Sequence, residues 1–330
     1  MRILVTGGLG FIGSNFILEI IAKFPDSKIV NVDAELDGSS QHNLTSIKKN
    51  PKYRFVKGNI TNRALVDKLV ANTDLVFNFA AESHVDRSIT SPEHFIKSNI
   101  VGVFTILESV RKYRKKMVQI STDEVFGSIK RGSAREANIL NPSSPYSSSK
   151  ASAELLVQSY SKTYGIDAMI TRCTNNFGPR QHIEKLIPRT ILFALNNKKI
   201  PIYGSGKAVR DWIYVQDHCD AVLDISQKGK WGESYNISAN NEIDNLTIVR
   251  KILKILGKPV DFIQHTEDRP GHDFRYSLDS SKIRKELKWK TQFRFDDALE
   301  KTIYWYLDNK QLFEKADSRM LKPVPWRNTK

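Results

Sequence analysis

Cysteine is scarce in this chain of 330 residues, which contains only Cys173 and Cys219. Two cysteines cannot build a disulfide framework or a structural zinc site, so we expect two reduced thiols and no metal. Long apolar runs are also missing, since no stretch approaches the roughly 20 residues of a membrane-spanning helix. The N-terminus leads straight into a strand pattern, without the charged and apolar segments of a signal peptide. These absences predict a cytoplasmic protein that does not enter a membrane.

Acidic residues are few relative to basic ones: 51 lysines and arginines face 36 aspartates and glutamates, which gives a net charge of +15. Such a balance fits a nucleic-acid binder, a membrane-surface protein or an enzyme for anionic substrates. The densest basic stretch, Arg111–Lys116, ends a helical pattern, where cations complement the helix dipole. The sequence has no RNA-binding aromatic motif, zinc finger or long basic tail. We therefore interpret the charge as a solvated surface and expect no nucleic-acid partner.

Strand-like and helical patterns alternate through the first half of the chain. Short β-rich apolar runs occupy residues 3–6, 29–32, 54–57, 75–79, 117–121 and 168–172. Amphipathic helical stretches lie between most of them, at residues 12–24, 62–70, 100–113 and 150–164. Strands that alternate with helices form a parallel sheet covered on both faces. The pattern predicts an α/β fold with a Rossmann-type doubly wound parallel sheet.

The texture changes after Gly178–Pro179, where loops become longer and richer in glycine, proline and asparagine. Helical patterns recur at residues 187–196, 215–228, 246–256, 280–287 and 295–308. We expect a first domain over residues 1–177 and a smaller, interleaved α/β domain over residues 178–330. Segments such as 210–228 are expected to return to the first domain, with 210–215 as a strand of its sheet.

A glycine-rich turn follows the first strand pattern and opens the first helical one. Gly7, Gly10 and Gly13 form a G-x-x-G-x-x-G motif, which permits a tight turn and a close approach of the backbone to a pyrophosphate. The helix N-terminus then presents N–H groups to the phosphates. Asp33 ends the second strand pattern 20 residues after Gly13, where an acid binds the adenosine ribose hydroxyls. Because a carboxylate repels a 2′-phosphate, the motif predicts NAD rather than NADP.

Two further groups of residues carry chemistry. Tyr146 and Lys150 share a face if they lie on a helix, and the lysine ammonium is expected to lower the pKa of the phenol. Such a tyrosine can take a proton from a sugar hydroxyl while hydride leaves for nicotinamide. Thr122, Asp123 and Glu124 follow the fifth strand pattern. An adjacent acid and base suit the elimination of water. A simple dehydrogenase or epimerase does not need such a pair.

These motifs resemble those of the extended short-chain dehydrogenase/reductase superfamily and, within it, closely those of the nucleotide-sugar 4,6-dehydratases. The similarity covers nearly the whole chain. The Asp-Glu pair after Thr122 and the DRPGHD segment best separate the dehydratases from the rest of the superfamily. The matching segments are GGLGFIGS (7–14), FAAESHVDRSI (79–89), STDEVFG (121–127), PYSSSKA (145–151), RCTNNFGPRQ (172–181), EKLIP (184–188), RDWIYVQDH (210–218) and DRPGHDFRYSLD (268–279).

The resemblance implies conversion of dTDP-glucose to dTDP-4-keto-6-deoxyglucose and water, with NAD as cofactor. It assigns oxidation at C4 to Tyr146, assisted by Lys150 and Thr122. Glu124 would then take the C5 proton, Asp123 would protonate the departing C6 hydroxyl, and hydride would return to C6.

The resemblance also implies which residues bind each ligand, and Arg210 would pair with the diphosphate because a guanidinium matches phosphate oxygens. The cofactor residues would be Gly7, Gly10, Phe11, Ile12, Gly13, Asp33, Asn59, Ile60, Ala80, Ala81, Ser98, Tyr146, Lys150 and Asn176. The residues for the sugar nucleotide would be Ser83, Thr122, Asn175, Lys185, Leu186, Arg210, Asn245, Asp268, Arg269, Pro270, Gly271 and His272.

Several positions depart from the family pattern. Phe126 and Phe177 stand where tyrosines are usual, and Asn59 replaces an aspartate that contacts adenine. Residues 34–39 read Ala-Glu-Leu-Asp-Gly-Ser instead of Lys-Leu-Thr-Tyr-Ala-Gly. The last two changes fall on expected cofactor contacts, and the added acids at 35 and 37 disfavour NADP further.

Alternatives to this interpretation stay open at the level of the sequence. UDP-glucose is an alternative substrate, because the single methyl group that separates thymine from uracil is worth only ~1–3 kcal/mol in a pocket. A NAD-dependent nucleotide-sugar epimerase or decarboxylase is a second alternative, and a non-catalytic Rossmann protein that binds NAD or RNA is a remote third. The resemblance also implies a homodimer formed through the helices at 100–113 and 150–164.

Overall fold

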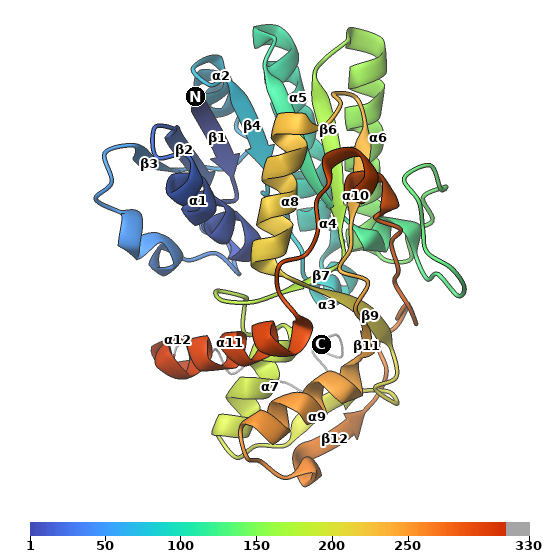
Figure 1. The fold of residues 1–330 in the computed structure, drawn as a ribbon. Coiled ribbons are helices and arrows are strands. Elements are labelled where there is room, and N and C mark those ends of the chain that lie inside the picture. The colour runs from blue at the N-terminus through green and yellow to red at the C-terminus, as the bar shows by residue number, and fades with distance from the viewer. Residues whose placement is uncertain (315–330) are drawn as a thin grey trace.

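A seven-stranded parallel sheet forms the larger half of residues 1–314, the part of the chain that the computed structural model describes. Its strands follow the order β10-β6-β5-β4-β1-β2-β3, and every neighbouring pair runs parallel. The predicted Rossmann-type, doubly wound arrangement is therefore confirmed (Figure 1). The strands are β1 (Arg2–Thr6), β2 (Lys28–Asp33), β3 (Tyr53–Lys57), β4 (Leu75–Asn78), β5 (Lys116–Thr122), β6 (Ala168–Cys173) and β10 (Ser234–Ile237).

Helices cover both faces of this sheet, because successive side chains of a strand point to opposite sides. Ile3 and Val5 of β1 join the core beneath α1 (Phe11–Lys23), α8 (Val215–Lys228) and α10 (Ser281–Leu287). Leu4, which lies between them, joins the core beneath α2 (Arg63–Ala71), α5 (Gly102–Tyr113) and α6 (Pro145–Tyr164). Each face thus buries one alternate set of apolar side chains.

A smaller body lies beneath the carboxyl edge of the sheet in the view of Figure 1. Its three-stranded sheet has the order β11-β9-β7, and its two-stranded sheet pairs β12 with β8. Phe177, Trp212 and Leu299 belong to its apolar core. Its elements are β7 (Asn175–Phe177), α7 (Leu186–Leu195), β8 (Ile200–Tyr203), β9 (Val209–Tyr214), β11 (Glu242–Asp244), α9 (Asn245–Ile255), η4 (Val260–Phe262), β12 (Ile263–Thr266), α11 (Phe295–Asp308) and α12 (Gln311–Glu314). The expected second domain runs to residue 330, and its residues 315–330 lie outside the described part.

One prediction about this interleaving is wrong. Residues 210–215 were expected to join the first sheet, but β9 pairs with β7 and β11 in the three-stranded sheet. There Trp212 packs in the core of the smaller body, and this packing decides the strand's place. The strand that returns to the first sheet is β10, which runs parallel to β6 and buries Tyr235 and Ile237 completely. The helix that follows β9, α8, packs against α1.

Helix α6 begins at Pro145, before the predicted start at residue 150, because its first turn is rich in serine and lacks apolar periodicity. Ser144 and Ser147 form a reciprocal capping box there, which fixes the start of the helix. The earlier start places Tyr146 and Lys150 on one helix. The remaining short elements are η1 (Gln41–Ile47), α3 (Val85–Thr90), α4 (Pro92–Phe95), the π-helical η2 (Ile96–Val101) and η3 (Asp123–Phe126).

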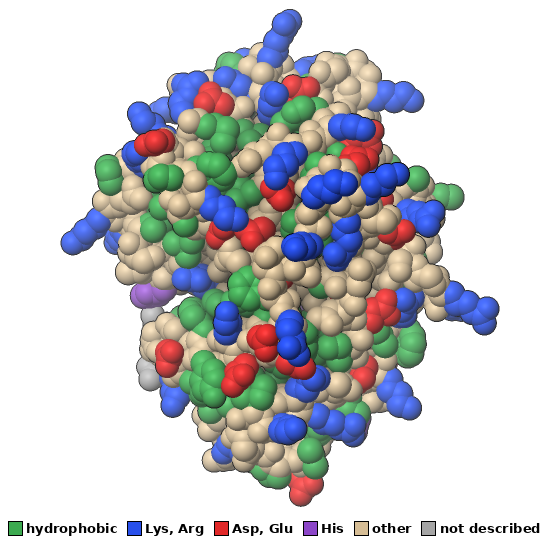
Figure 2. Space-filling model, in the orientation of Figure 1, with side chains coloured by type: hydrophobic (Ala, Val, Ile, Leu, Met, Phe, Trp, Pro, Cys, Tyr) green, Lys and Arg blue, Asp and Glu red, His purple; other side chains and the backbone are tan. Residues whose placement is uncertain are grey.

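On the face drawn in Figure 2, basic side chains lie over both halves of the molecule, with acidic side chains among them. Within the basic stretch at 111–116, Arg111 pairs with Glu108 and lies 4.5 Å from the ring centre of Tyr164. Lys112 pairs with Asp67 at 2.6 Å. Part of this stretch is therefore neutralised by neighbouring acids. In residues 1–314, no helix has the length and apolar character needed to cross a membrane.

A buried ion pair anchors α6 to the sheet. The side chains of Arg172 on β6 and Glu154 on α6 are 1% and 0% exposed and meet at 2.7 Å. We expect Glu154→Gln to lower the free energy of unfolding by about 3–5 kcal/mol, because it leaves the guanidinium charge buried and uncompensated. Urea denaturation measures this loss. The exposed pair between Lys228 and Asp224 is the control, since Asp224→Asn should cost less than about 1 kcal/mol. Equal losses in the two variants would contradict the prediction.

Candidate active site

A large cavity opens at the carboxyl edge of the seven-stranded sheet, where open α/β sheets bind ligands. All the predicted catalytic residues and all the predicted cofactor residues lie in its wall. Four of the residues predicted for the sugar nucleotide also line it: Ser83, Thr122, Asn175 and Lys185. The fold thus brings together side chains from the ends of β1, β2, β4 and β5, from the segment after β6 and from α6.

The glycine turn after β1 has the shape that a pyrophosphate needs. Gly7 has a φ of 69°, and a Cβ there would lie 2.5 Å from the backbone nitrogen of Ala80. A Cβ on Gly13 would lie 2.4 Å from the carbonyl oxygen of Gly7. Only glycine fits either position. Gly10 is the N-cap of α1 and offers no side chain, so the first N–H groups of the helix face the cavity without a side-chain cap.

The adenosine end of the cavity is built around Asp33, whose side chain is 7% exposed. Its carboxylate accepts hydrogen bonds from the backbone N–H groups of Leu9 at 3.0 Å and Glu35 at 2.8 Å. The unusual acids of the 34–39 segment are both partnered, since Glu35 pairs with Lys57 at 2.9 Å and Asp37 with Arg87 at 2.5 Å. Asp33 and Asp37 line this end of the cavity, and a carboxylate at Asp33 fits the ribose hydroxyls of NAD.

Lys150 and Tyr146 project from α6 toward the end of β5. The ammonium of Lys150 donates a hydrogen bond of 2.6 Å to the carbonyl of Ile120, and burial lowers the pKa of this lysine to about 8. Burial raises the pKa of the Tyr146 phenol well above its usual value, and the carboxylate of Glu124 raises it further. The pKa of this phenol is thus raised overall rather than lowered as expected, because desolvation outweighs the contacts that favour the phenolate. A hydrogen bond with Thr122 is the contact that favours the phenolate.

Asp123 and Glu124 begin η3 directly after β5 and lie in different electrostatic surroundings. Asp123 is 3% exposed, and its Oδ2 atom has no hydrogen-bond partner within residues 1–314. Burial and the neighbouring Glu124 raise the pKa of Asp123 well above its usual range. Burial also raises the pKa of Glu124, but three cations oppose this effect: Arg269, Lys185 and Arg210. The two groups therefore differ in their surroundings: burial and Glu124 favour the protonated form of Asp123, whereas three cations favour the carboxylate form of Glu124.

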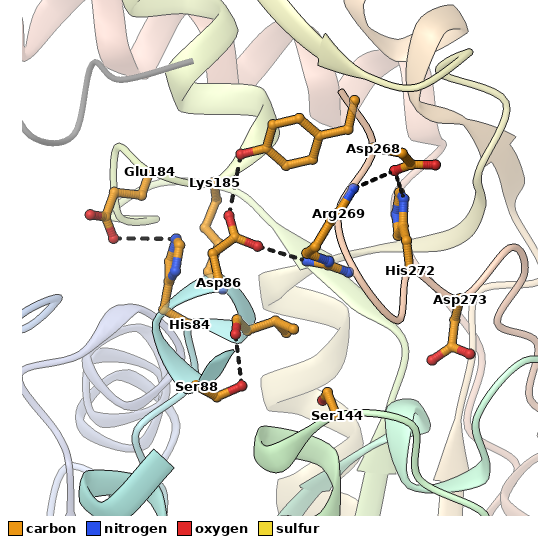
Figure 3. Close-up of polar contacts among 12 residues, drawn as sticks. His84, Asp86, Ser88, Ser144, Glu184, Lys185, Asp268, Arg269, His272 and Asp273 are labelled. Carbon is orange, nitrogen blue, oxygen red and sulfur yellow. Dashed lines mark hydrogen bonds and ion pairs between the residues drawn. The ribbon is translucent and has the colours of Figure 1, made fainter. Parts of the chain in front are cut away.

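Eight residues predicted for the sugar nucleotide lie outside the cavity wall: Leu186, Arg210, Asn245, Asp268, Arg269, Pro270, Gly271 and His272. The guanidinium of Arg210 donates hydrogen bonds to backbone carbonyl groups, that of Val209 at 2.7 Å and that of Asp273 at 2.9 Å. Leu186 packs among apolar side chains, and Asn245 opens α9. In the 268–272 loop, His272 pairs with Asp268 at 2.6 Å, as Figure 3 shows. Arg269 and Arg210 nevertheless influence the site, because their positive charges lower the pKa of Glu124.

Sequence reasoning missed several polar residues at this site. The hydroxyl of Tyr276 donates to Asp273 at 2.8 Å and lies 3.4 Å from Glu124. His84 lies 3.3 Å from Glu184, and both line the cavity (Figure 3). All four fall inside or next to the segments that resemble the dehydratases, which is the signal that could have found them. Burial lowers the pKa of His84 to about 4, so this ring is neutral at pH 7.

The departures at Phe126 and Phe177 are both buried, at 3% and 1% exposure. Phe126 lies beneath the guanidinium of Arg172, 4.9 Å from ring centre to Cζ. Phe177 packs against Trp212 and Phe295 in the smaller body. Neither ring lines the cavity, so the missing phenol groups leave the wall of the site unchanged.

Comparison with known proteins adds relatives of established identity. A family model described as GDP-mannose 4,6 dehydratase matches residues 4–302. A dTDP-glucose 4,6-dehydratase of Mycobacterium tuberculosis is 44% identical over 313 residues, 94% of each chain. The low-salt glycan biosynthesis protein Agl12 of Haloferax volcanii is 47% identical over 308 residues, 93% of this chain and 99% of the relative. The crystal structure of a dTDP-glucose 4,6-dehydratase from Streptomyces venezuelae, solved with NAD bound, superposes with a TM-score of 0.93 at 40% identity, covering 94% of this chain and 98% of that one.

The glycine turn yields a direct test of the cofactor site. In Gly13→Ala the new Cβ would meet the carbonyl of Gly7, so the turn must shift away from the pyrophosphate position. We expect the affinity for NAD to fall at least about tenfold, since one or two hydrogen bonds to phosphate are lost. Calorimetric titration with NAD measures this affinity, and thermal melting checks that the variant is folded. A folded variant that binds NAD like the unaltered protein would refute this account of the turn.

Proposed function

Since the chain belongs to the nucleotide-sugar 4,6-dehydratase family, as its motifs predicted, we propose that it converts dTDP-glucose to dTDP-4-keto-6-deoxyglucose and water. The observation that carries this proposal is that the adjacent carboxyl groups of Asp123, which is buried, and Glu124 lie beside Tyr146 in one cavity. An epimerase or decarboxylase of the same fold needs the tyrosine but not an acid that holds its proton next to a base.

NAD is the cofactor of this reaction, and when bound it accepts hydride from C4 of the glucose and later returns it to C6. The glycine turn and the N-terminus of α1 hold its pyrophosphate, and Asp33 holds the adenosine ribose. Tyr146 takes the proton of the C4 hydroxyl during oxidation. Tyr146 must be a phenolate to accept this proton, and the hydrogen bond from Thr122 favours that form, while Lys150 lies on the same face of α6.

Elimination of water follows once C4 is a ketone, because the neighbouring C5–H bond becomes acidic. Glu124 takes the C5 proton, and the electron pair of that bond forms the C5–C6 double bond. The C6–O bond breaks, and the oxygen leaves as water with the proton that Asp123 holds. Glu124 then returns a proton to C5 as hydride reaches C6. The charges around Asp123 and Glu124 support these opposite roles.

The thymidine base is supported by the relatives, which are named for dTDP-glucose. UDP-glucose remains the second candidate, since a hydrophobic pocket separates the two bases by only ~1–3 kcal/mol. Kinetics with the two sugar nucleotides side by side decide between them. A kcat/KM in favour of UDP-glucose would change the substrate and leave the reaction type in place.

Asp123→Asn tests the assignment of the acid. The amide cannot supply the proton for the departing hydroxyl, so we expect formation of the 4-keto product to fall roughly 10²- to 10⁴-fold. Oxidation at C4 should persist, and reduced nicotinamide should therefore accumulate and be visible by its absorbance. The control is Asp224→Asn on the outer side of α8, which should turn over normally. Full turnover by Asp123→Asn would instead favour an epimerase or a decarboxylase.

We further propose that the protein is a homodimer that works in the cytoplasm. Helices α5 and α6 pack side by side and expose large apolar side chains to solvent: Phe104 is 43% exposed, Leu155 56% and Tyr164 49%. An apolar surface on two neighbouring helices suits pairing with the same surface of a second copy, as the family resemblance implies. The two buried, unpaired cysteine thiols suit a reducing compartment.

The dimer proposal predicts that Leu155→Glu yields monomers, because a charge would be buried at the centre of the helix pair. Sedimentation analysis measures the mass in solution. Ile255→Glu, on α9 of the smaller body, places the same charge at a partly exposed apolar position outside this surface and should leave the dimer intact. If the unaltered protein sediments as a monomer, the dimer proposal is wrong.

A further inference from the structure

The carboxylate of Asp86 lies where the two halves of the molecule meet. It belongs to the first turn of α3, in the segment that follows β4 of the seven-stranded sheet, and it is 6% exposed. Its Oδ1 atom accepts a hydrogen bond of 3.1 Å from the guanidinium of Arg269, and its Oδ2 atom accepts one of 3.2 Å from the hydroxyl of Tyr203. Figure 3 shows Asp86 pointing across to Arg269.

Both partners of Asp86 come from the ends of neighbouring strands in the smaller body. Tyr203 ends β8, and Arg269 follows β12, which pairs with β8 in parallel register. The hydroxyl of Tyr203 also accepts a hydrogen bond of 3.3 Å from Arg189 on α7. One carboxylate from the sheet-bearing half thus connects to a β-strand pair, a loop and a helix of the other half.

Arg269 acts on Glu124 through its charge and carries a buried polar atom that has no hydrogen-bond partner in residues 1–314. Its charge is the largest of the cationic effects on Glu124, and Asp86 and Glu124 both act on it from their side. The negative charges of Asp86 and Glu124 also act on the ammonium of Lys185. Within the described residues, the Nε atom of Arg269 is buried and has no hydrogen-bond partner. A buried donor without a partner is costly, so an acceptor oxygen of a ligand is favoured at this position.

We propose that Asp86 is a positioning residue for substrate binding: it holds the Arg269 guanidinium, by one of its ends, where the remaining N–H groups meet the anionic sugar nucleotide. This role rests on the proposed function, because it takes a nucleotide diphosphate sugar as the ligand. Without the contact to Asp86, the long and flexible arginine side chain loses its fixed orientation. The free energy of ligand binding is then reduced by the entropic cost of ordering this side chain. Charge compensation by Asp86 also keeps Arg269 from closing onto Glu124 as an ion pair.

The variant Asp86→Asn tests this role, since asparagine keeps the size of the side chain and removes its charge. We expect the dissociation constant of thymidine diphosphate, measured by calorimetry, and the KM for dTDP-glucose to rise roughly 10- to 100-fold, the range for a charge-assisted hydrogen bond. The change in kcat should be smaller, and the NAD content of the purified protein should not change. Tyr203→Phe leaves the charge in place and should weaken binding less, by roughly 2- to 10-fold.

A matched control is Ser88→Ala on the same helix. Ser88 is fully buried and its hydroxyl donates only to the carbonyl of Val85 at 2.7 Å, so this variant disturbs α3 without touching Arg269. It should bind thymidine diphosphate like the unaltered protein. If Asp86 acts through Arg269, Asp86→Asn should add little to the loss already caused by Arg269→Ala.

Two results would overturn the positioning role: an Asp86→Asn variant that binds thymidine diphosphate as tightly as Ser88→Ala, or losses that multiply fully in the double variant. Failure of the proposed function is seen separately, as an unaltered protein that forms no 4-keto product. In that case the affinities for thymidine diphosphate still report on Asp86. An unaltered protein that does not bind thymidine diphosphate would overturn both proposals.

Discussion

A parallel sheet presents the carboxyl ends of its strands at one edge, and this constraint places nearly every group of the site. The chain returns to that edge at the glycine turn after β1, at Asp33, which ends β2, and at Thr122, which ends β5. Helix α6 must cross the same edge to cover β5 and β6, so Tyr146 and Lys150 in its first turns meet the ends of those strands. The hydrogen bond from Lys150 to Ile120 and the buried pair of Arg172 with Glu154 fix that crossing.

Burial alone would make the two adjacent carboxyl groups alike, because it raises both pKa values. Their neighbours separate them. Asp123 feels chiefly the negative charge of Glu124, whereas Glu124 feels the cations of the smaller body. The pKa of Asp123 is thus set mainly by groups at the sheet edge, and the pKa of Glu124 is set in part by cations of the other half of the molecule. The two halves must be docked for the pair to have opposite roles, and contacts across their boundary, such as that between Asp86 and Arg269, are part of the chemistry.

The sequence was informative where its patterns report burial or a strict geometric need. The short apolar runs of β1 to β6 and the glycines at 7 and 13 belong to this class, and both predictions match the structure in place and kind. Strand β10 escaped notice because Ser234 and Asn236 conceal an apolar set of only two residues, and its place depends on a pairing with distant β6. The pKa of Tyr146 was misjudged because spacing along a helix reports which groups are near, but not how deeply the surrounding chain buries them. The partners of the 268–272 loop depend on the docking of the two halves, which no local pattern encodes.

The positive charge of the chain shows the same distinction between composition and placement. The excess of 15 cations suggested an affinity for anions, yet the stretch at 111–116 leads into the amino end of β5, whereas the carboxyl end of β5 lines the cavity, and the stretch is partly paired with surface acids. Three cations act on Glu124: Arg210, which is buried, and Lys185 and Arg269, which are half-buried. A desolvated cation attracts a phosphate oxygen far more strongly than a hydrated surface lysine does, since the effective dielectric constant is lower. It also repels neighbouring cations more strongly, and among these three Arg269 is held by the carboxylate of Asp86. Recognition of an anion in this fold therefore depends on buried acids as much as on bases, and net charge is a poor measure of it.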